Sequence, residues 1–144
     1  MMDLQQIGVI RTPYKKIKDV PYNDSLTDEI CDLVFFPAFE EGLKDAEQAS
    51  HYIILYWLDK AKRTVLRERN PHDHKNHGIF VTRTPNRPNP LGLSVAELVE
   101  KKGAILKVKG ITALDKTPLL DIKPYFPDTD SIPNAAIKWL ENIL

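Results

Sequence analysis

One proline-rich stretch, residues 78–94, holds the densest group of side chains suited to binding a charged ligand. It reads Gly-Ile-Phe-Val-Thr-Arg-Thr-Pro-Asn-Arg-Pro-Asn-Pro-Leu-Gly-Leu-Ser. Proline fixes its own φ angle and restricts the residue before it, so the prolines at 85, 88 and 90 predict a stiff loop. A stiff loop loses little conformational entropy when a ligand binds. The stretch therefore predicts a preorganised binding loop.

Two arginines and an asparagine supply the polar groups of this loop. Arg83 and Arg87 carry planar guanidinium forks, which recognise carboxylates and phosphates. Asn89 offers both a donor and an acceptor, and Gly92 is expected to let the backbone approach a ligand closely. These groups indicate a site for an anionic ligand. The alternative is a proline-rich turn that carries surface arginines.

A second stretch, residues 115–125, reads Asp-Lys-Thr-Pro-Leu-Leu-Asp-Ile-Lys-Pro-Tyr. Its first four residues have the composition of a tight turn. Asp121, Lys123 and Tyr125 alternate, so on a strand their side chains would share one face. Such a face could bind polar groups or move a proton. The alternative is a solvent face, on which an Asp–Lys pair contributes little.

Short strands with few helices are expected to position both stretches, within one domain that covers residues 1–144. The pattern favours a β-barrel or a sandwich, and no G-x-G-x-x-G sequence supports a Rossmann-type domain. A short helix is expected near residue 40 and an amphipathic helix at the C-terminus, over residues 38–48 and 132–144. The expected strands are residues 4–12, 30–36, 52–58, 78–82, 93–101, 104–111 and 119–122.

The charge balance limits the classes of partner. The formal net charge is zero, which argues against strong non-specific affinity for nucleic acid but permits a local basic patch. A solvated surface is the alternative for the basic clusters. These clusters are Lys15, Lys16 and Lys18, and then Lys60, Lys62, Arg63, Arg67 and Arg69.

The cysteine and the histidines offer little chemistry of their own. Cys31 is the only cysteine and lies in an apolar stretch, so we expect a small buried residue and not a nucleophile. His72, His74 and His77 lie in a polar segment, for which a solvated loop is favoured over a metal site. No apolar run suits a membrane helix and no signal-peptide pattern is present, so we expect a cytoplasmic protein.

Three segments together resemble the TsaA-like family. Residues 78–94 match its hallmark, Gly-(Ile/Val)-Phe-x-(Thr/Ser)-Arg-(Ser/Thr)-Pro-x-Arg-Pro-Asn-Pro-(Ile/Leu)-Gly-(Leu/Met)-Ser. Residues 115–125 match a second hallmark, Asp-x-Thr-Pro-(Leu/Val)-Leu-Asp-Ile-Lys-Pro-Tyr. Residues 7–14 resemble the family's opening, Ile-Gly-x-Ile-x-Ser-Pro-(Phe/Tyr). The resemblance covers most of the chain.

The resemblance implies an all-β fold, a small closed β-barrel. It also implies that the protein is a homodimer. It identifies the chain with TrmO-type tRNA methyltransferases, in a short form without the C-terminal domain of better-known bacterial relatives. These enzymes use S-adenosylmethionine to methylate N6 of threonylcarbamoyladenosine beside the anticodon. The alternatives are a methyltransferase of the same fold acting on another RNA or a small molecule, and a non-enzymatic module that binds S-adenosylmethionine or a metal.

The same resemblance implies a set of site residues, with no metal ligand among them. Two cofactor-binding regions depart from the family, because relatives often have Pro-Arg-Gln at residues 21–23 and Phe-His at residues 58–59. We expect Asp121 and Tyr125 to contact substrate or move a proton, as catalytic residues. The residues expected to bind substrate are Arg87, Asn89 and Lys123. The residues expected to bind the cofactor are Pro21, Tyr22, Asn23, Leu58, Asp59, Arg83, Leu93, Asp115, Lys116, Thr117 and Pro118.

Overall fold

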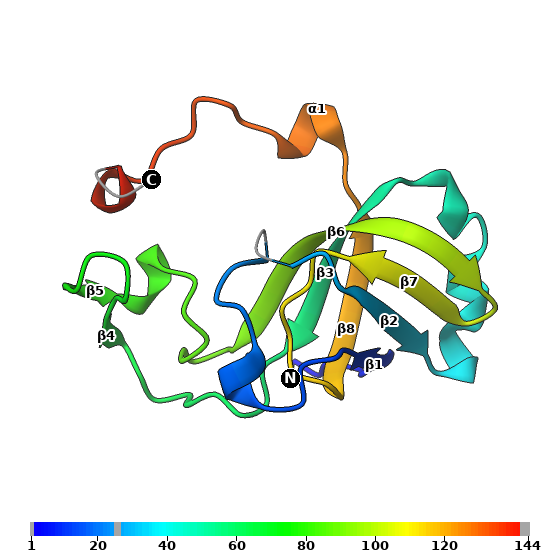
Figure 1. The fold of residues 1–144 in the computed structure, drawn as a ribbon, viewed down its shortest axis with the longest axis horizontal. Coiled ribbons are helices and arrows are strands. Elements are labelled where there is room, and N and C mark those ends of the chain that lie inside the picture. Colours follow the sequence, from blue (N-terminus) through cyan, green and yellow to red (C-terminus); the bar gives the residue numbers. More distant parts are fainter. Residues whose placement is uncertain (1, 25–26, 142–144) are drawn as a thin grey trace. The chain divides into compact units, whose positions relative to one another are not determined.

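A closed barrel of six antiparallel strands forms the centre of the fold, in the order β1-β2-β7-β6-β3-β8 (Figure 1). The structure is a computed structural model that describes residues 2–24 and 27–141. The barrel confirms the expected all-β class. Its strands are β1 (Gly8–Arg11), β2 (Ile30–Phe35), β3 (His51–Trp57), β6 (Leu91–Lys102), β7 (Ile105–Lys109) and β8 (Thr117–Pro124).

Alternation along the strands fills the barrel. Successive side chains of a strand point to opposite faces, so every second residue enters the core. In β6 the even-numbered residues from Gly92 to Ala96 are buried and the odd-numbered ones are exposed. Hydrophobic side chains from all six strands are fully buried inside, including Ile10, Leu33, Ile54, Ala96, Leu106 and Leu119.

Cys31 belongs to this core. Its side chain is buried and its thiol is free. Burial raises the pKa of the thiol from 9.0 to about 11, and the nearby Asp32 carboxylate adds to the effect. A thiol with so high a pKa is a poor nucleophile at neutral pH, as the sequence indicates.

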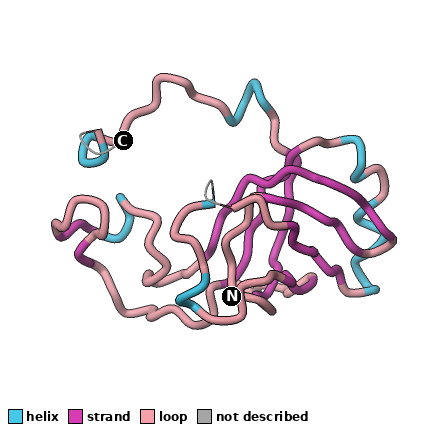
Figure 2. Tube along the Cα trace, viewed as in Figure 1, coloured by secondary structure: helices cyan, strands magenta, loops and turns pink. Residues whose placement is uncertain are grey.

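The chain forms two compact units. The barrel unit comprises Met1–Asp59 and Leu91–Tyr125, and the second unit comprises Lys60–Pro90 and Phe126–Leu144. Most of the second unit is loop (Figure 2). The expected single domain over residues 1–144 stays a prediction. The regular elements of the second unit are β4 (Arg67–Arg69), β5 (Asn76–Gly78), α1 (Pro127–Asp130), and the 3-10 helices Ile79–Val81 and Lys138–Leu140.

Two expected elements have a different form in the structure. The strand expected over residues 78–82 is wrong, because the chain turns into a 3-10 helix over Ile79–Val81 and the Thr82 amide and hydroxyl both donate to the Ile79 carbonyl. The helix expected over residues 38–48 is two 3-10 helices, Pro37–Leu43 and Ala46–Gln48. They are separated at Asp45, whose φ of 67° no right-handed helix can continue. A further 3-10 helix covers Ile17–Asp19.

The C-terminal helix expected over residues 132–144 is shorter in the described part of the chain. Only Lys138–Leu140 is helical there, as one 3-10 turn, and residues 142–144 lie outside the described residues. Pro133 disfavours helical backbone at Ile132. Ile132 and Ile137 are exposed, so this segment lacks the buried apolar face that stabilises a short helix. Within residues 2–24 and 27–141, every helix is too short to cross a lipid bilayer.

Gly92 is required by the packing of the barrel interior. It lies opposite Tyr56 in the β3–β6 pairing, and a Cβ atom at Gly92 would lie 2.1 Å from the Tyr56 ring. The Tyr56 hydroxyl shares a hydrogen bond of 2.8 Å with Ser94 Oγ, and both groups are buried. This packing gives Gly92 a structural reason of its own, and the close approach of its backbone to a ligand stays a prediction. The absence of a side chain leaves room for an aromatic ring of the protein itself.

We expect Gly92→Ala to lower the free energy of unfolding by about 1–3 kcal/mol, because the Tyr56 ring must shift. Gly78→Ala is the matched control, since Gly78 has a φ of −60° and no atom within 4 Å of an added Cβ. We expect this control to stay within about 0.5 kcal/mol of the wild type. Urea unfolding of both variants checks this, and equal midpoints would contradict the role given to Gly92.

Candidate functional site

Four strand ends meet at one end of the barrel and bring several of the expected cofactor residues together. β1 and β3 end there, and β6 and β8 begin there, because their antiparallel registers pair Ile10 with Thr117 and Trp57 with Leu91. β3 and β8 also pair directly, with Tyr56 opposite Leu119. Residues 58–59 and 115–118 therefore lie at the same end of the barrel (Figure 1).

The segment with Pro21, Tyr22 and Asn23 belongs to the same region. Asp24, the next residue, accepts hydrogen bonds at Oδ1 from the amide and the hydroxyl of Thr112, at 3.0 Å and 2.5 Å. Thr112 lies in the connection from β7 to β8, three residues before Asp115. These bonds hold residues 21–24 beside the connection that leads into the expected cofactor turn.

Asp115 anchors that turn. Its Oδ1 accepts hydrogen bonds from the Thr12 amide at 2.9 Å and from Arg11 Nε at 3.1 Å, and its Oδ2 lies 2.7 Å from Lys15 Nζ. The Asp115 side chain is only 6% exposed. Burial raises the pKa of this carboxyl, but the three donors together lower it by more, so it falls from 3.8 to about 2.

Since both oxygens of Asp115 are already bound within the chain, this side chain shapes the turn and leaves direct ligand contacts to its neighbours. Thr117 is also committed, because its buried hydroxyl donates to the Leu114 carbonyl at 2.6 Å. Lys116 is exposed and has a φ of 71°. Lys116 and the half-buried Pro118 are thus the side chains of the turn that remain open to a ligand.

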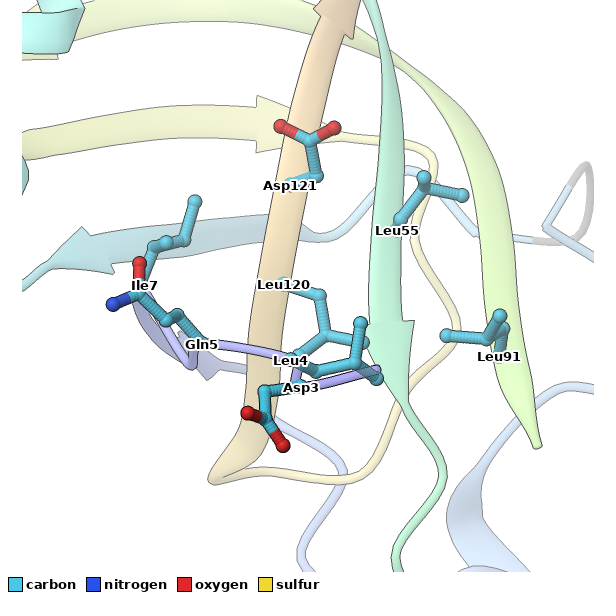
Figure 3. Close-up of a pocket in the computed structure, with 8 residues that line it drawn as sticks. All are labelled: Asp3, Leu4, Gln5, Ile7, Leu55, Leu91, Leu120 and Asp121. Carbon is cyan, nitrogen blue, oxygen red and sulfur yellow. The ribbon is translucent and has the colours of Figure 1, made fainter. Parts of the chain in front are cut away.

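An open pocket of about 580 Å³ lies on the outer face of the barrel next to this end (Figure 3). Leu55 of β3, Leu91 of β6 and Leu120 of β8 form one group of its lining residues. The expected cofactor residue Leu93 lies two positions beyond Leu91, faces outward and pairs with Leu55. The outer face here is therefore apolar over three adjacent strands.

Sequence patterns did not indicate the N-terminal part of this pocket. Leu4 lies beside Leu120, and the Asp3 and Asp121 carboxylates stand on either side of the leucines in Figure 3. Leu4 was expected to begin the first strand, but β1 begins only at Gly8, so Leu4 lies outside the barrel strands and is exposed. The complete lining is Asp3, Leu4, Gln5, Ile7, Leu55, Leu91, Leu120 and Asp121.

The two expected catalytic residues lie at different positions along the barrel, Asp121 within β8 and Tyr125 just beyond its end. Asp121 lines the pocket and pairs with Lys123 at 3.2 Å, so these two side chains share a face as expected. Tyr125 follows β8 at the far end of the barrel, where its amide donates to the His51 carbonyl at 3.0 Å. Tyr125 lies eight positions beyond Thr117, about 26 Å at 3.3 Å per residue. The structure thus brings Asp121, and not Tyr125, toward the cofactor residues.

In the second unit, Arg87 stabilises the proline-rich loop from within. Its guanidinium donates to the carbonyls of Ile79, Thr82 and Thr84 at 3.0–3.2 Å. Such a committed group is poorly placed to bind substrate, so the role expected for Arg87 gives way to a structural one. Arg83 is exposed and has no side-chain hydrogen bond or ion pair among the described residues, which leaves its guanidinium open.

Asn89 and its neighbours brace the same loop. Asn89 Oδ1 accepts a hydrogen bond from Arg63 Nη2 at 3.3 Å, and Arg63 Nε donates to the Pro88 carbonyl at 2.8 Å. Asn86 bridges the Lys62 amide and the Glu68 carboxylate, at 2.9 Å and 3.0 Å. The loop is therefore held by hydrogen bonds as well as by the proline φ angles that predicted its stiffness.

The histidine segment is more ordered than a solvated loop. His77 Nε2 lies 2.6 Å from Asp73 Oδ2, and the His77 ring stacks on Trp139 with 4.6 Å between the ring centroids. Asn70 is buried, and its Oδ1 accepts a hydrogen bond from the His72 amide at 2.8 Å. In residues 2–24 and 27–141, no three metal-ligating side chains come together.

The chain is similar in sequence to a known protein family and to several known proteins. Residues 9–131 match the family described as tRNA-methyltransferase O N-terminal domain. A probable S-adenosyl-L-methionine-binding protein of Archaeoglobus fulgidus is 50% identical over 141 residues, which cover 98% of this chain and 38% of that protein. A protein of the same description from Pyrococcus abyssi is 49% identical over 143 residues, which cover 98% of this chain and 77% of that protein.

Two further proteins are more distant. The tRNA (adenine(37)-N6)-methyltransferase of Escherichia coli is 33% identical, over 96% of this chain and 63% of its own length. The crystal structure of TrmO from Pseudomonas aeruginosa is similar with a TM-score of 0.78 and 32% identity, over 94% of this chain and 61% of that one. This chain thus spans less than two thirds of the Archaeoglobus, Escherichia and Pseudomonas proteins.

We expect Asp115→Asn to lower the free energy of unfolding by about 1–3 kcal/mol at neutral pH, because two cations lose their partner. The pKa of Asp115 is lower in the folded chain than in the unfolded one. Its contribution is therefore complete above about pH 4 and is lost as the pH falls toward about 2. Urea unfolding of wild type and variant between these pH values measures the difference.

Asp32→Asn is the control, because Asp32 pairs with Lys107 at 3.1 Å but is 33% exposed. We expect it to cost under about 1 kcal/mol at neutral pH. A loss in Asp115→Asn that does not change with pH would contradict the role assigned to its charge.

Proposed function

Because the chain belongs to the family of the tRNA-methyltransferase O N-terminal domain, we propose that it binds S-adenosylmethionine and methylates a modified adenosine in tRNA. The specific acceptor proposed is N6 of threonylcarbamoyladenosine next to the anticodon. The observation that carries the proposal is the meeting of residues 21–24, 58–59 and 115–118 at one end of the barrel, beside an apolar pocket.

The chemical types of the pocket residues suit S-adenosylmethionine. S-adenosylmethionine combines an aromatic adenine, whose flat faces make apolar contacts, with a positively charged sulfonium and an amino-acid end that carries an ammonium and a carboxylate. Leu55, Leu91 and Leu120 offer the apolar contact, and the carboxylates of Asp3 and Asp121 favour positive charge. Ligand pockets of about this size commonly combine apolar walls with a few polar groups in this way.

The chemistry requires alignment more than covalent help from the protein. S-adenosylmethionine, when bound, supplies a methyl group on a positively charged sulfur. The side chains of Lys116, Pro118 and Leu93 are open to hold the cofactor in place. Alignment of the two reacting molecules by the protein can account for a large part of an enzyme's rate enhancement. The acceptor nitrogen lies next to a carbonyl, so its proton is more acidic than that of plain adenine. Asp121 is one of the two carboxylates of the pocket, and it is the one that we propose accepts this proton.

A binding-only module is the second candidate. The Archaeoglobus and Pyrococcus relatives are described as S-adenosyl-L-methionine-binding proteins, without a stated reaction. A methyltransferase of the same fold that acts on another RNA or on a small molecule is the third. Calorimetry with S-adenosylmethionine and nucleoside analysis of tRNA separate these candidates.

We also propose that the protein is a cytoplasmic homodimer. The support is the family resemblance, together with the outward residues Leu91, Leu93 and Val95 of β6, which are each more than 40% exposed. Light scattering tests this proposal, because a dimer has twice the 16.5 kDa mass of the chain. A mass of one chain at all concentrations would overturn it.

Calorimetry with S-adenosylmethionine tests the cofactor. We expect the wild type to bind and Leu93→Ala to bind about five- to tenfold more weakly, because an apolar contact is lost. Val99→Ala is the matched control, since Val99 is a similarly exposed residue further along the same strand. We expect less than a twofold change for this control. The absence of binding by the wild type would exclude both the methyltransferases and the binding module.

Nucleoside analysis after incubation with tRNA tests the reaction. We expect methylation of threonylcarbamoylated tRNA but not of unmodified tRNA, and a reduction in kcat of about 10²-fold or more in Asp121→Asn. Full turnover by Asp121→Asn would rule out this carboxylate as the base. Binding of the cofactor without methylation of any tRNA would favour the binding module.

A further inference from the structure

The charge of the chain is strongly segregated along the sequence. Residues 60–90 contain eight Lys and Arg but only two Asp and Glu, a formal charge of +6. The chain as a whole is neutral, so the remaining residues carry −6. Whole-chain charge therefore conceals a basic segment, and the distribution of charge governs the binding of polyanions.

The two acidic residues of this segment are turned inward and occupied. Glu68 is half-buried and accepts a hydrogen bond from Asn86 Nδ2 at 3.0 Å. Asp73 is half-buried against His77 at 2.6 Å, and the pKa of Asp73 is lowered because its hydrogen bonds with the His77 ring and the Lys75 amide outweigh its burial. The carboxylates thus stabilise the unit internally and leave the exposed charge of residues 60–90 positive.

The exposed cations are not explained by internal partners. The β4–β5 hairpin places Glu68 opposite His77, while Arg67 and Arg69 flank Glu68 and so share the other face. Both arginines are exposed. In the described part of the chain, six exposed cations of this segment have no side-chain hydrogen bond or ion pair: Lys60, Lys62, Arg67, Arg69, Lys75 and Arg83.

A large aromatic side chain is exposed in the same segment. Phe80 is 78% exposed, although phenylalanine is a residue that cores normally bury. The backbone beside it is fixed, since the Val81 carbonyl accepts a hydrogen bond from Trp139 Nε1 at 3.0 Å and Thr82 closes the turn on Ile79. The exposed ring is therefore presented by a well-held turn, which reduces the entropy lost when a flat partner stacks on it.

We propose that residues 60–83 form the RNA-binding surface of this protein, with Phe80 stacking on an unpaired base and Arg67 and Arg69 on the phosphates. An unstacked base offers a flat face to an aromatic ring, and the adjacent phosphates require cations. A paired stem would hide the faces of its bases, so an unpaired loop is the favoured partner. The proposal rests on the proposed function for its choice of RNA and adds the surface that holds it.

Fluorescence anisotropy with a short labelled RNA hairpin that carries an unpaired loop tests the surface. We expect Phe80→Ala to weaken binding about tenfold. In Arg67→Ser/Arg69→Ser we expect the slope of log K against log salt, measured between about 50 and 200 mM, to become shallower by about 1.4 for two lost phosphate contacts. A blunt RNA duplex of the same length should bind more weakly and lose little on Phe80→Ala.

Lys44→Ser/Lys102→Ser is the matched control, because it removes two exposed cations from the barrel unit. Unchanged hairpin binding by Phe80→Ala and by Arg67→Ser/Arg69→Ser, or an equal loss in the control, would overturn the proposal. Circular dichroism verifies that each variant is folded.

Calorimetry with S-adenosylmethionine on the same variants separates this inference from the proposed function. We expect Arg67→Ser/Arg69→Ser to bind the cofactor as the wild type does while losing RNA affinity. If the wild type binds the hairpin through this surface but not the cofactor, the proposed function fails and the surface stands. If the cofactor binds and the variants retain their hairpin affinity, the surface fails and the cofactor site stands.

Discussion

One buried carboxylate, Asp115, holds the end of the barrel on which the candidate site depends. It joins the turn before β8 to the end of β1, and its single negative charge attracts both Arg11 and Lys15. Because these groups come from parts of the chain about a hundred residues apart, the ion cluster fixes a non-local contact that packing alone specifies weakly. The neighbouring turn can then present Lys116 without itself needing a charged ligand for stability.

Strand parity decides which side chains of the barrel reach a ligand. In β6, Gly92 and Ser94 face inward to receive Tyr56, whereas Leu93 between them faces out. The same motif thus serves the core and the outer surface in alternate residues. In the second unit, hydrogen bonding decides which arginine can reach a ligand. Arg87 donates to backbone carbonyls, while Arg83, four residues earlier, remains open.

The barrel was predictable from the sequence because period-2 alternation is a local signal, and residues 105–109 show it clearly. The stiffness of the proline loop was also predictable, because proline restricts the backbone locally. The role of Arg87 was not predictable, because whether a guanidinium bonds to its own loop or to a ligand depends on the folded geometry. The 3-10 turn after Gly78 depends on a Thr82 hydroxyl that competes with strand pairing. The pocket lining at Leu4 depends on contacts between distant segments.

The burial of Cys31 has a consequence for the kinetics of the fold. Its thiol is enclosed by β-strands and loses its proton only well above neutral pH, so an alkylating reagent in solution meets a reactive sulfur only after β2 has separated from its neighbours. With one cysteine in the chain, each modified molecule records a single opening event of the barrel. The rate of Cys31 alkylation therefore reports how often the barrel opens, and it does so without altering the surfaces that face the ligands.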